Sequence, residues 1–455
     1  MPFNSLQFIF LFLPVVLVLW RLFRRRQHAL AFMIGASYLF YALAAGWYAL
    51  LMVVSTSVDF AVGLLLDAEQ RPGRRKLILC LSLVFNLGLL SFFKYYGFVV
   101  DSVNTLAGYP LLQAVAGVAL PAGISFYTFQ SMGYSIDVYR RDLKPSKSFI
   151  EFASFVSLFP QLIAGPIVRP KLLLPQLAAQ GPVDNARVTS GAMLFAAGLC
   201  KKVLVADRLA WYADPILNAP GAYGSVDLWL AMVAFALQIY FDFSGYTDMA
   251  RGLARLLGLE FSINFDSPYH ARNPSDFWKR WHVSLSSWLR DYLYIPLGGN
   301  RKGRGRTGLN LFITMFLGGL WHGAGVNFIV WGSFHGLLLL VYHRIEKPWS
   351  TLPRGVQHAV MLFVLLVSWI PFRMHTMHDL GAFAVHATLA PHLPTAPPQL
   401  WGYVLLGAGL SALPRNSNDI RWGALGWPTT LALALLVVVA VLHLNLSSKF
   451  IYFAF

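Results

Sequence analysis

The chain has 455 residues, of which 57% are hydrophobic and 12% are charged. Soluble domains carry about 25% charged residues, so this composition excludes an ordinary water-soluble globular protein. The formal net charge is +16, but the basic residues gather in short loops at residues 21–26, 71–76 and 301–306, between apolar runs. The positive-inside rule assigns such loops to the cytoplasmic side of a membrane. We therefore expect contact with membrane lipid and no nucleic-acid partner.

The first part of the chain contains apolar runs long enough to cross a membrane. About 20 helical residues span the hydrocarbon core, and we predict spans at residues 6–20, 77–99 and 121–136. Residues 29–66 lie between two basic loops, so this stretch must enter and leave the membrane as a hairpin or a pair of spans. The arginines follow the first apolar run, which is the reverse of a cleavable secretory signal. We expect a retained first span with Met1 outside the cytoplasm.

Residues 149–169 are apolar but are interrupted by Pro160, Gly165 and Pro166. Such interruptions are tolerated at membrane depth only where the backbone is buried in protein or lines a cavity. The pattern predicts a re-entrant segment, followed by a helix at residues 190–206.

A polar and aromatic region at residues 260–306 follows a predicted span at residues 228–241. After Pro274 the sequence predicts a helix, and Ser275 has the chemistry of its N-cap. We expect this helix to lie in the membrane interface, because apolar and aromatic residues recur on one side and charges occupy positions between them. The apolar side comprises Trp278, His282, Leu285, Leu289 and Tyr292, and the intervening charges include Lys279, Arg280, Arg290 and Asp291.

Residues 307–343 contain no Lys, Arg, Asp or Glu, and the stretch is too long for one untilted span. Glycines recur through it, which favours a bend or tight packing. Later spans are predicted at residues 359–370, 400–413 and 431–444. Together these elements predict an all-α polytopic membrane protein with a single integral membrane domain over residues 1–455.

His322 is the strongest candidate for a catalytic residue. It lies 16 residues from Arg306 and 22 from Arg344, which on a helix is about 25 Å or more from either charge. An ionisable side chain at that depth is costly and is a functional hypothesis by default. A neutral imidazole there can accept a proton, as a general base for a hydroxyl acceptor must. The alternative is a structural histidine bonded to a backbone carbonyl, and position alone favours neither.

Two other histidines are weaker candidates. His282 lies on the apolar side of the predicted interfacial helix, where it can orient an acyl donor or a partner histidine, although a packed and hydrogen-bonded histidine is the commoner case. His335 follows His322 by thirteen residues and would point well away from it on an unbroken helix. We interpret His335 as structural.

The other polar residues in apolar stretches are better explained by structural roles than by catalytic ones. Asp242 and Asp248 stand at the end of a predicted span, where carboxylates need partners, and we interpret them as hydrogen-bonding links within the helix bundle. Cys80 and Cys200 have no His or Cys at ligand spacing nearby, so neither a disulfide nor a metal site is predicted. No serine, cysteine or carboxylate pair has the local context of a nucleophile.

The basic loop before the uncharged stretch is a candidate donor site. Residues 303–308 match a dinucleotide-binding glycine pattern, but no βαβ unit surrounds them, which excludes that interpretation. The loop instead offers cations to the phosphates of a donor such as coenzyme A, with anchoring to lipid headgroups as the simpler alternative. The cations are Arg301, Lys302, Arg304 and Arg306.

Several motifs resemble one family throughout the chain. The most specific are WKRWHVSLS at residues 278–286, WLRDYLYIPLGGNR at residues 288–301 and LWHGA at residues 320–324. Further matches are GISFY at 123–127, IDVYR at 136–140, FPQLIAGP at 159–166, YFDFSGYTD at 240–248 and FIYF at 450–453. In this order they resemble the membrane-bound O-acyltransferases, specifically the branch that acetylates alginate and other polysaccharides. Val326 departs from the branch, which commonly has a tryptophan there.

The resemblance implies a fold and a set of site residues. It implies a helical bundle with re-entrant and interfacial helices around a central tunnel, in which a cytosolic thioester and an extracytoplasmic acceptor meet near His322. It makes His322 the essential histidine and His282 a second active-site histidine. The residues that we expect to support this site are Asp242, Trp321, Arg290 and Asp291.

The resemblance also implies a function. Acetyl-CoA or another short acyl thioester is the expected donor, with no bound cofactor. The acetyl group is expected to pass across the bacterial inner membrane to a periplasmic acetyltransferase partner or to a carrier, and to end on a polysaccharide such as alginate, cellulose or peptidoglycan. One alternative is transfer of another acyl group, such as D-alanine to teichoic acid. A second alternative is a transporter without chemistry, which broken helices and intramembrane polar groups alone suggest.

Overall fold

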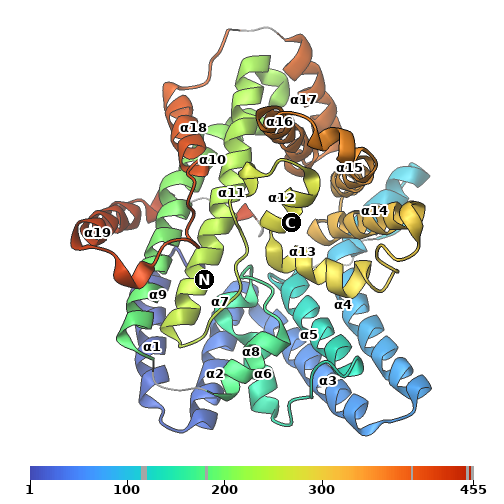
Figure 1. Cartoon of the computed structure of the whole chain (residues 1–455), viewed down its shortest axis with the longest axis vertical. Helices are drawn as coiled ribbons and strands as arrows, with labels where there is room; N and C mark the ends of the chain where they lie inside the picture. Colours follow the sequence, from blue (N-terminus) through green and yellow to red (C-terminus); the bar gives the residue numbers. More distant parts are fainter. Residues whose placement is uncertain (114–119, 180–182, 391–392, 447–449, 452–455) are drawn as a thin grey trace. The chain divides into compact units, whose positions relative to one another are not determined.

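The computed structural model describes residues 1–113, 120–179, 183–390, 393–446 and 450–451. These residues form helices and connecting loops without a strand, which confirms the all-α prediction (Figure 1). Six helical segments among them are long and apolar enough to cross a membrane, so the chain is a multi-pass membrane protein. They are Arg26–Ala68, Pro72–Ala107, Asn185–Asn218, Ser225–Leu256, Val326–Ser350 and Arg354–Arg373.

The chain divides into two compact units. The first comprises Met1–Phe195, Met249–Ser262 and Trp422–Ala424, and the second comprises Ala196–Asp248, Ile263–Arg421 and Leu425–Phe455.

The first unit begins with the helices that the apolar runs predict. Its first elements are η1 (Phe8–Phe12), α1 (Leu13–Leu22), α2 (Arg26–Ala45), η2 (Gly46–Tyr48), α3 (Ala49–Ala68), α4 (Pro72–Ala107) and α5 (Ile124–Tyr139). Residues 29–66 thus lie in two helices joined by η2, which fits the predicted hairpin or pair of spans. Helices α3, α4 and α5 lie side by side (Figure 1). Between them the Asp59 carboxylate accepts two hydrogen bonds of 3.0 Å from Asn86 and one of 2.9 Å from Ser82, so a buried carboxylate links the helices.

The proline-interrupted segment is broken and buried, as predicted. It forms α6 (Phe149–Ser157) and α7 (Phe159–Leu162), and residues 152–168 are all buried. Gly123 approaches it so closely that an added Cβ would stand 2.6 Å from the Leu162 carbonyl oxygen. The unit continues with α8 (Pro170–Ala178) and the start of α9 (Asn185–Cys200).

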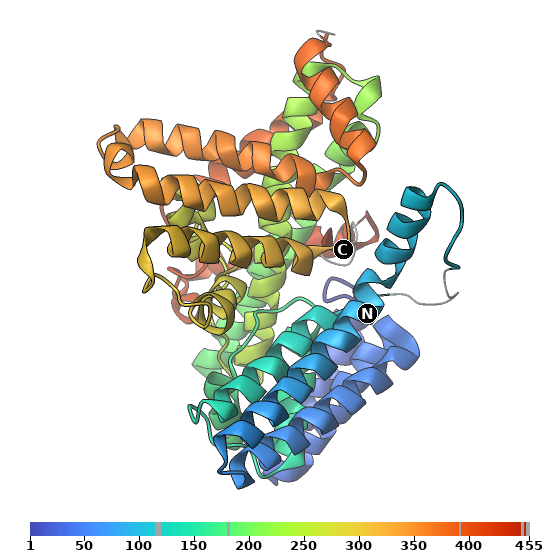
Figure 2. The same ribbon diagram turned by 90° about the vertical axis from the view of Figure 1, so that its right-hand side faces the viewer.

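The second unit holds the residues with candidate chemistry. Helices α14, α15 and α16 lie beside one another in it (Figure 2). In chain order its elements are the end of α9, η3 (Lys201–Ala206), α10 (Asp207–Asn218), η4 (Pro220–Ala222), most of α11 (Ser225–Leu256), η5 (Pro268–His270), α12 (Pro274–Arg280), α13 (Val283–Leu289), η6 (Arg290–Tyr294), α14 (Gly303–His322), α15 (Val326–Ser350), α16 (Arg354–Arg373), α17 (Met377–Leu389), α18 (Pro398–Ser411), α19 (Trp427–Leu442) and η8 (Leu444–Leu446). The short η7 (Trp422–Ala424) belongs to the first unit.

The prediction of one continuous helix through residues 275–292 is wrong. Helix α12 ends at Arg280, and α13 begins at Val283. Between them His282 has a φ of 44°, in the left-handed region that a right-handed helix cannot continue through. The N-cap is Asn273, whose side chain accepts a hydrogen bond from the Asp276 N–H, so the prediction of Ser275 as the cap is also wrong.

The uncharged stretch folds back on itself, as its glycines predict. Helix α14 ends at His322, and α15 returns from Val326 after a short link. The two backbones meet at Gly319 and Gly332, where a Cβ added to Gly319 would stand 2.8 Å from the Gly332 Cα. Neither position has room for a side chain.

Replacing Gly319 with alanine is expected to lower the free energy of unfolding by about 1–3 kcal/mol, because the methyl group must separate two packed helices. Thermal unfolding of the purified protein measures the effect. Gly409→Ala in α18 is the matched control, since nothing lies within 4 Å of its added Cβ. Equal melting temperatures for the two variants would contradict the close packing.

Candidate active site

His322 ends α14 inside a box of aromatic rings. Its side chain is buried, and its ring centroid lies 4.9 Å from that of Trp331 and 5.5 Å from that of Phe372. The neighbouring Trp321 ring is 5.0 Å away. Because the imidazole stands at the carbonyl end of a helix, the helix dipole favours the positive charge that it would take up as a base.

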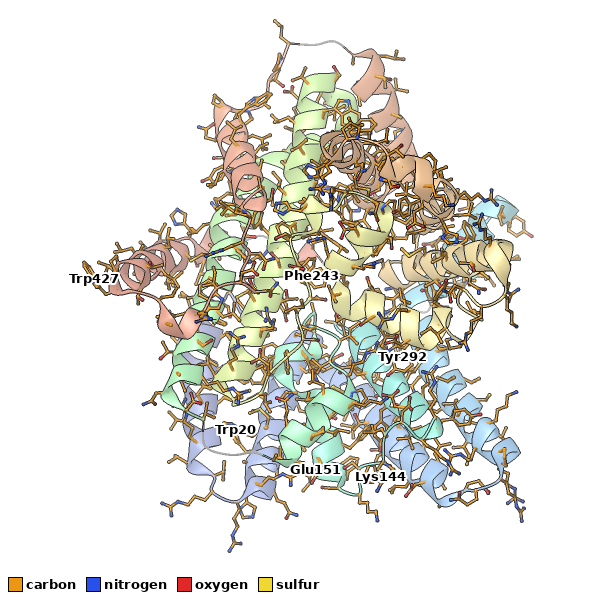
Figure 3. The ribbon with its side chains drawn as sticks, viewed as in Figure 1. Trp20, Lys144, Glu151, Phe243, Tyr292 and Trp427 are labelled. Carbon is orange, nitrogen blue, oxygen red and sulfur yellow. The ribbon has the colours of Figure 1, made fainter. Side chains whose placement is uncertain are left out.

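His282 comes to the same place from another part of the sequence. Its ring lies 6.0 Å from Trp321 and 4.7 Å from Phe243, a residue of α11 that is labelled in Figure 3. Both histidines that the sequence singled out therefore border one indole, that of Trp321. The structure brings these three predicted residues together.

The hydrogen bonds around His282 determine its tautomer. The Nδ1 atom lies 3.0 Å from Asn264 Oδ1, and the same oxygen accepts hydrogen bonds from the Ser284 N–H at 3.2 Å and the Ser284 hydroxyl at 2.8 Å. The backbone N–H can only donate, so the Asn264 atom that it meets must be the oxygen. His282 Nδ1 then carries the proton, and Nε2 presents a lone pair.

Burial lowers the pKa of His282 to about 3, from about 6.5 for a free histidine. The unfolded chain therefore binds the proton at a higher pH than the folded chain. Stability falls as the pH drops below about 6.5, by up to about 1.4 kcal/mol per pH unit, until the folded form also protonates near pH 3. The ring faces Asn264, Phe243 and Trp321.

We expect the melting temperature of His282→Asn to fall less steeply than that of the wild type between pH 6.5 and pH 5. Thermal unfolding at a series of pH values measures both slopes. Parallel slopes would show that the imidazole is not the titrating group.

His335 also belongs to this aromatic region, contrary to the expectation for an unbroken helix. The link between α14 and α15 reverses the chain, and the His335 ring lies 4.8 Å from Trp331, the same indole that contacts His322. The His335 side chain is 1% exposed, and neither ring nitrogen has a hydrogen-bond partner among the described residues. Leaving such an atom unsatisfied costs about 1–3 kcal/mol.

Asp242 is a structural link, as predicted, but it lies within α11 and not at its end. The Lys202 ammonium lies between the Asp242 carboxylate at 2.8 Å and the Asp207 carboxylate at 2.7 Å, all three buried. Asp242 also accepts a 2.9 Å hydrogen bond from the Ile451 N–H. It is one residue before Phe243, so this ion cluster borders the wall of the histidine site. Asp248 pairs with Lys201 at 2.7 Å.

The other predicted residues lie at the surface. Arg290 and Asp291 form an ion pair at 2.7 Å on η6, next to the histidine-bearing segments in sequence but outside the aromatic box. Arg301, Lys302, Arg304 and Arg306 are exposed in the loop before α14 and in its first turn. Arg304 lines a cavity of about 300 Å³ with His343 and Arg344, which gives the loop a cationic recess suited to phosphate.

Comparison with known proteins identifies the family. Residues 138–369, about half of the chain, match the sequence model described as MBOAT, membrane-bound O-acyltransferase family. The chain belongs to the membrane-bound O-acyltransferases. It is therefore an acyltransferase enzyme, and the matched segment includes His282, Trp321 and His322.

Individual acyltransferases of this family show how far the similarity extends. The chain is 41% identical over 389 residues to a probable alginate O-acetylase AlgI of Pseudomonas syringae, covering 84% of this chain and 74% of that protein. It is 34% identical over 413 residues to the peptidoglycan O-acetyltransferase of Helicobacter pylori, covering 83% and 78%. Similarity to the teichoic acid D-alanyltransferase of Bacillus subtilis is lower, 27% over 55% of this chain and 66% of that protein.

The structure adds two residues around the candidate histidines that the sequence analysis did not single out. Asn264 sets the tautomer of His282, and its only sequence signal is an amide among apolar residues after α11. Trp331 joins His322 to His335. Trp331 reaches His322 because the chain reverses after Gly323. The glycine pattern indicates this reversal but does not determine which α15 residues face which α14 residues.

Proposed function

We propose that this chain is an O-acetyltransferase of the bacterial inner membrane, which takes acetyl from cytosolic acetyl-CoA for the O-acetylation of a cell-envelope polysaccharide. The family and the named relatives support acyl transfer of this kind. The single observation that carries the assignment is the placement of buried His322 and His282 against one indole, that of Trp321.

The proposed reaction needs one base and one acceptor hydroxyl. His322 takes the proton from the hydroxyl as its oxygen attacks the thioester carbonyl, and the tetrahedral intermediate then expels the thiolate. The imidazolium returns the proton to the thiolate, so that a new ester and a free thiol leave together. In the folded protein His282 presents its Nε2 lone pair, and we assign it to orienting the acceptor hydroxyl or His322.

The two substrates are proposed to arrive from opposite sides. The arginine loop before α14 lies on the cytoplasmic side by the positive-inside rule, and its cations suit the phosphates of coenzyme A. The acceptor is a hydroxyl of a periplasmic acetyltransferase partner or of a carrier, which delivers acetyl to the polymer. The polymer in the named relatives is alginate or peptidoglycan, and we propose the same class of acceptor for this chain.

The test is transfer from radiolabelled acetyl-CoA by the purified chain in lipid nanodiscs, with periplasmic extract or a polysaccharide as acceptor. We expect label in an alkali-labile ester. Parallel reactions with a D-alanyl carrier protein test the related activity. Label from the D-alanyl donor alone would redirect the donor assignment, and label from neither donor would contradict the proposed function.

A further inference from the structure

A cluster of buried nitrogen atoms lies beside the proposed catalytic histidine. The indole N–H groups of Trp278 and Trp331 and both ring nitrogens of His335 are buried without a hydrogen-bond partner among the described residues. The His335 ring centroid lies 5.1 Å from that of Trp278 and 4.8 Å from that of Trp331, so the four nitrogen atoms form one cluster. Nearly all buried polar atoms in native proteins are satisfied. A ligand that binds here would supply the missing partners.

Helix α15 connects this cluster to both His322 and a pocket. Trp331, His335 and Leu339 are spaced four residues apart, so they occupy one face of the helix at steps of about 6 Å. Trp331 contacts His322 at one end of this row, and Leu339 lines the pocket at the other. His335 is therefore the middle residue of a row that runs from the pocket to the proposed base.

The pocket has the size and lining of a small-molecule site. Its volume is about 350 Å³, within the range of ligand pockets. Trp278, Met315 and Leu339 give it apolar walls, and hydroxyl groups and the cations Lys279 and Arg290 complete its lining. Its α14 residues lie between the arginines that begin the helix and His322 that ends it. A donor passing from the arginine loop to His322 would meet this pocket on the way.

We propose that His335, with Trp278 and Trp331, binds the amide-bearing arm of the thioester donor. This inference rests on the proposed function. A pantetheine arm is long and narrow, carries two amide groups between its thiol and its phosphate, and matches the cluster in chemistry. The indole N–H groups donate to amide carbonyls, and the neutral imidazole offers one donor and one acceptor, which an amide complements. Lys279 and Arg290 suit the phosphate at the outer end of the arm.

The test compares coenzyme A binding to full-length variants in nanodiscs by isothermal titration calorimetry. His335→Phe keeps a ring and removes both nitrogens, whereas His335→Asn restores one donor and one acceptor. We expect His335→Phe to raise the Kd for coenzyme A about tenfold, equivalent to about 1.4 kcal/mol, and His335→Asn to recover most of the loss. Trp278→Phe should weaken binding several-fold because it removes only the N–H. In the transfer assay, KM for acetyl-CoA should rise more than kcat falls.

The control is His378→Phe, because that side chain is 92% exposed on α17 and contacts no part of the cluster. It should leave the Kd unchanged. Wild-type affinity in both His335→Phe and Trp278→Phe would overturn the inference and indicate that water alone occupies the cluster, while acetyl transfer by the wild type would leave the proposed function standing. If the wild type neither binds coenzyme A nor transfers acetyl from it, both proposals fail.

Discussion

Replacing His322 with alanine is expected to lower kcat/KM for acetyl transfer by about 10² to 10⁴-fold, the range that a positioned general base contributes. The ring lies against Trp331 and Phe372, and Trp331 also contacts His335. The loss should appear in kcat, because the proton transfer occurs only as the reaction proceeds. Transfer from radiolabelled acetyl-CoA in nanodiscs measures it.

Two companion variants separate chemistry from packing. His322→Gln fills more of the space and still lacks a basic nitrogen, so it should be as inactive as His322→Ala while melting closer to the wild type. His378→Ala, on the exposed start of α17, should retain full activity. Turnover near the wild-type rate in His322→Gln would rule out the base mechanism.

Replacing Lys202 with methionine is expected to lower the free energy of unfolding by about 3–5 kcal/mol, because it leaves two buried carboxylates without their shared cation. Lys202 lies 2.7 Å from Asp207 and 2.8 Å from Asp242, and all three side chains are buried. Thermal unfolding in detergent measures the change. Arg74→Ala is the surface control, since that side chain is 63% exposed in its pair with Glu69 and its loss should leave the melting temperature close to that of the wild type.

Neutralising the whole ion cluster should restore much of the lost stability. The triple variant Lys202→Met, Asp207→Asn, Asp242→Asn removes all three charges of the cluster at nearly constant volume. We therefore expect it to melt above Lys202→Met alone. If Lys202→Met melts at the wild-type temperature, the three groups do not form a tight cluster in the folded protein.

The apolar runs predicted most of the helices because the bilayer sets a minimum length for a span. Two helix pairs, α2 with α3 and α14 with α15, were expected because their sequences are too long or too interrupted by glycine for one membrane span. The broken and buried segment of α6 and α7 follows from Pro160 and Gly165, since irregular backbone at membrane depth must be buried or line a cavity. Helices α4 and α11 extend beyond the spans predicted at residues 77–99 and 228–241. The added turns carry polar residues with partners on other elements, such as Arg75, which donates to the Val138 and Tyr139 carbonyls, and Asp248, which pairs with Lys201.

The site was predicted in part. Family motifs located His282, Trp321 and His322, and the structure places them together. The helical periodicity wrongly predicted a continuous helix through residues 281–282. Hydrogen bonds that Asn264 accepts from His282 and Ser284 hold the backbone there in a non-helical conformation that residue spacing does not predict. The role of Lys202 was missed because pairing within a buried cluster depends on contacts far apart in sequence.

The left-handed backbone at His282 affects how substitutions there should be read. Asparagine adopts φ values near 44° with little penalty, whereas alanine costs about 1–2 kcal/mol at such a position. A loss of activity in His282→Ala would therefore combine the effect of a strained backbone with the effect of the missing imidazole. Asparagine and glycine are the substitutions that report on the imidazole alone, and natural variation at this position should favour the same few residue types.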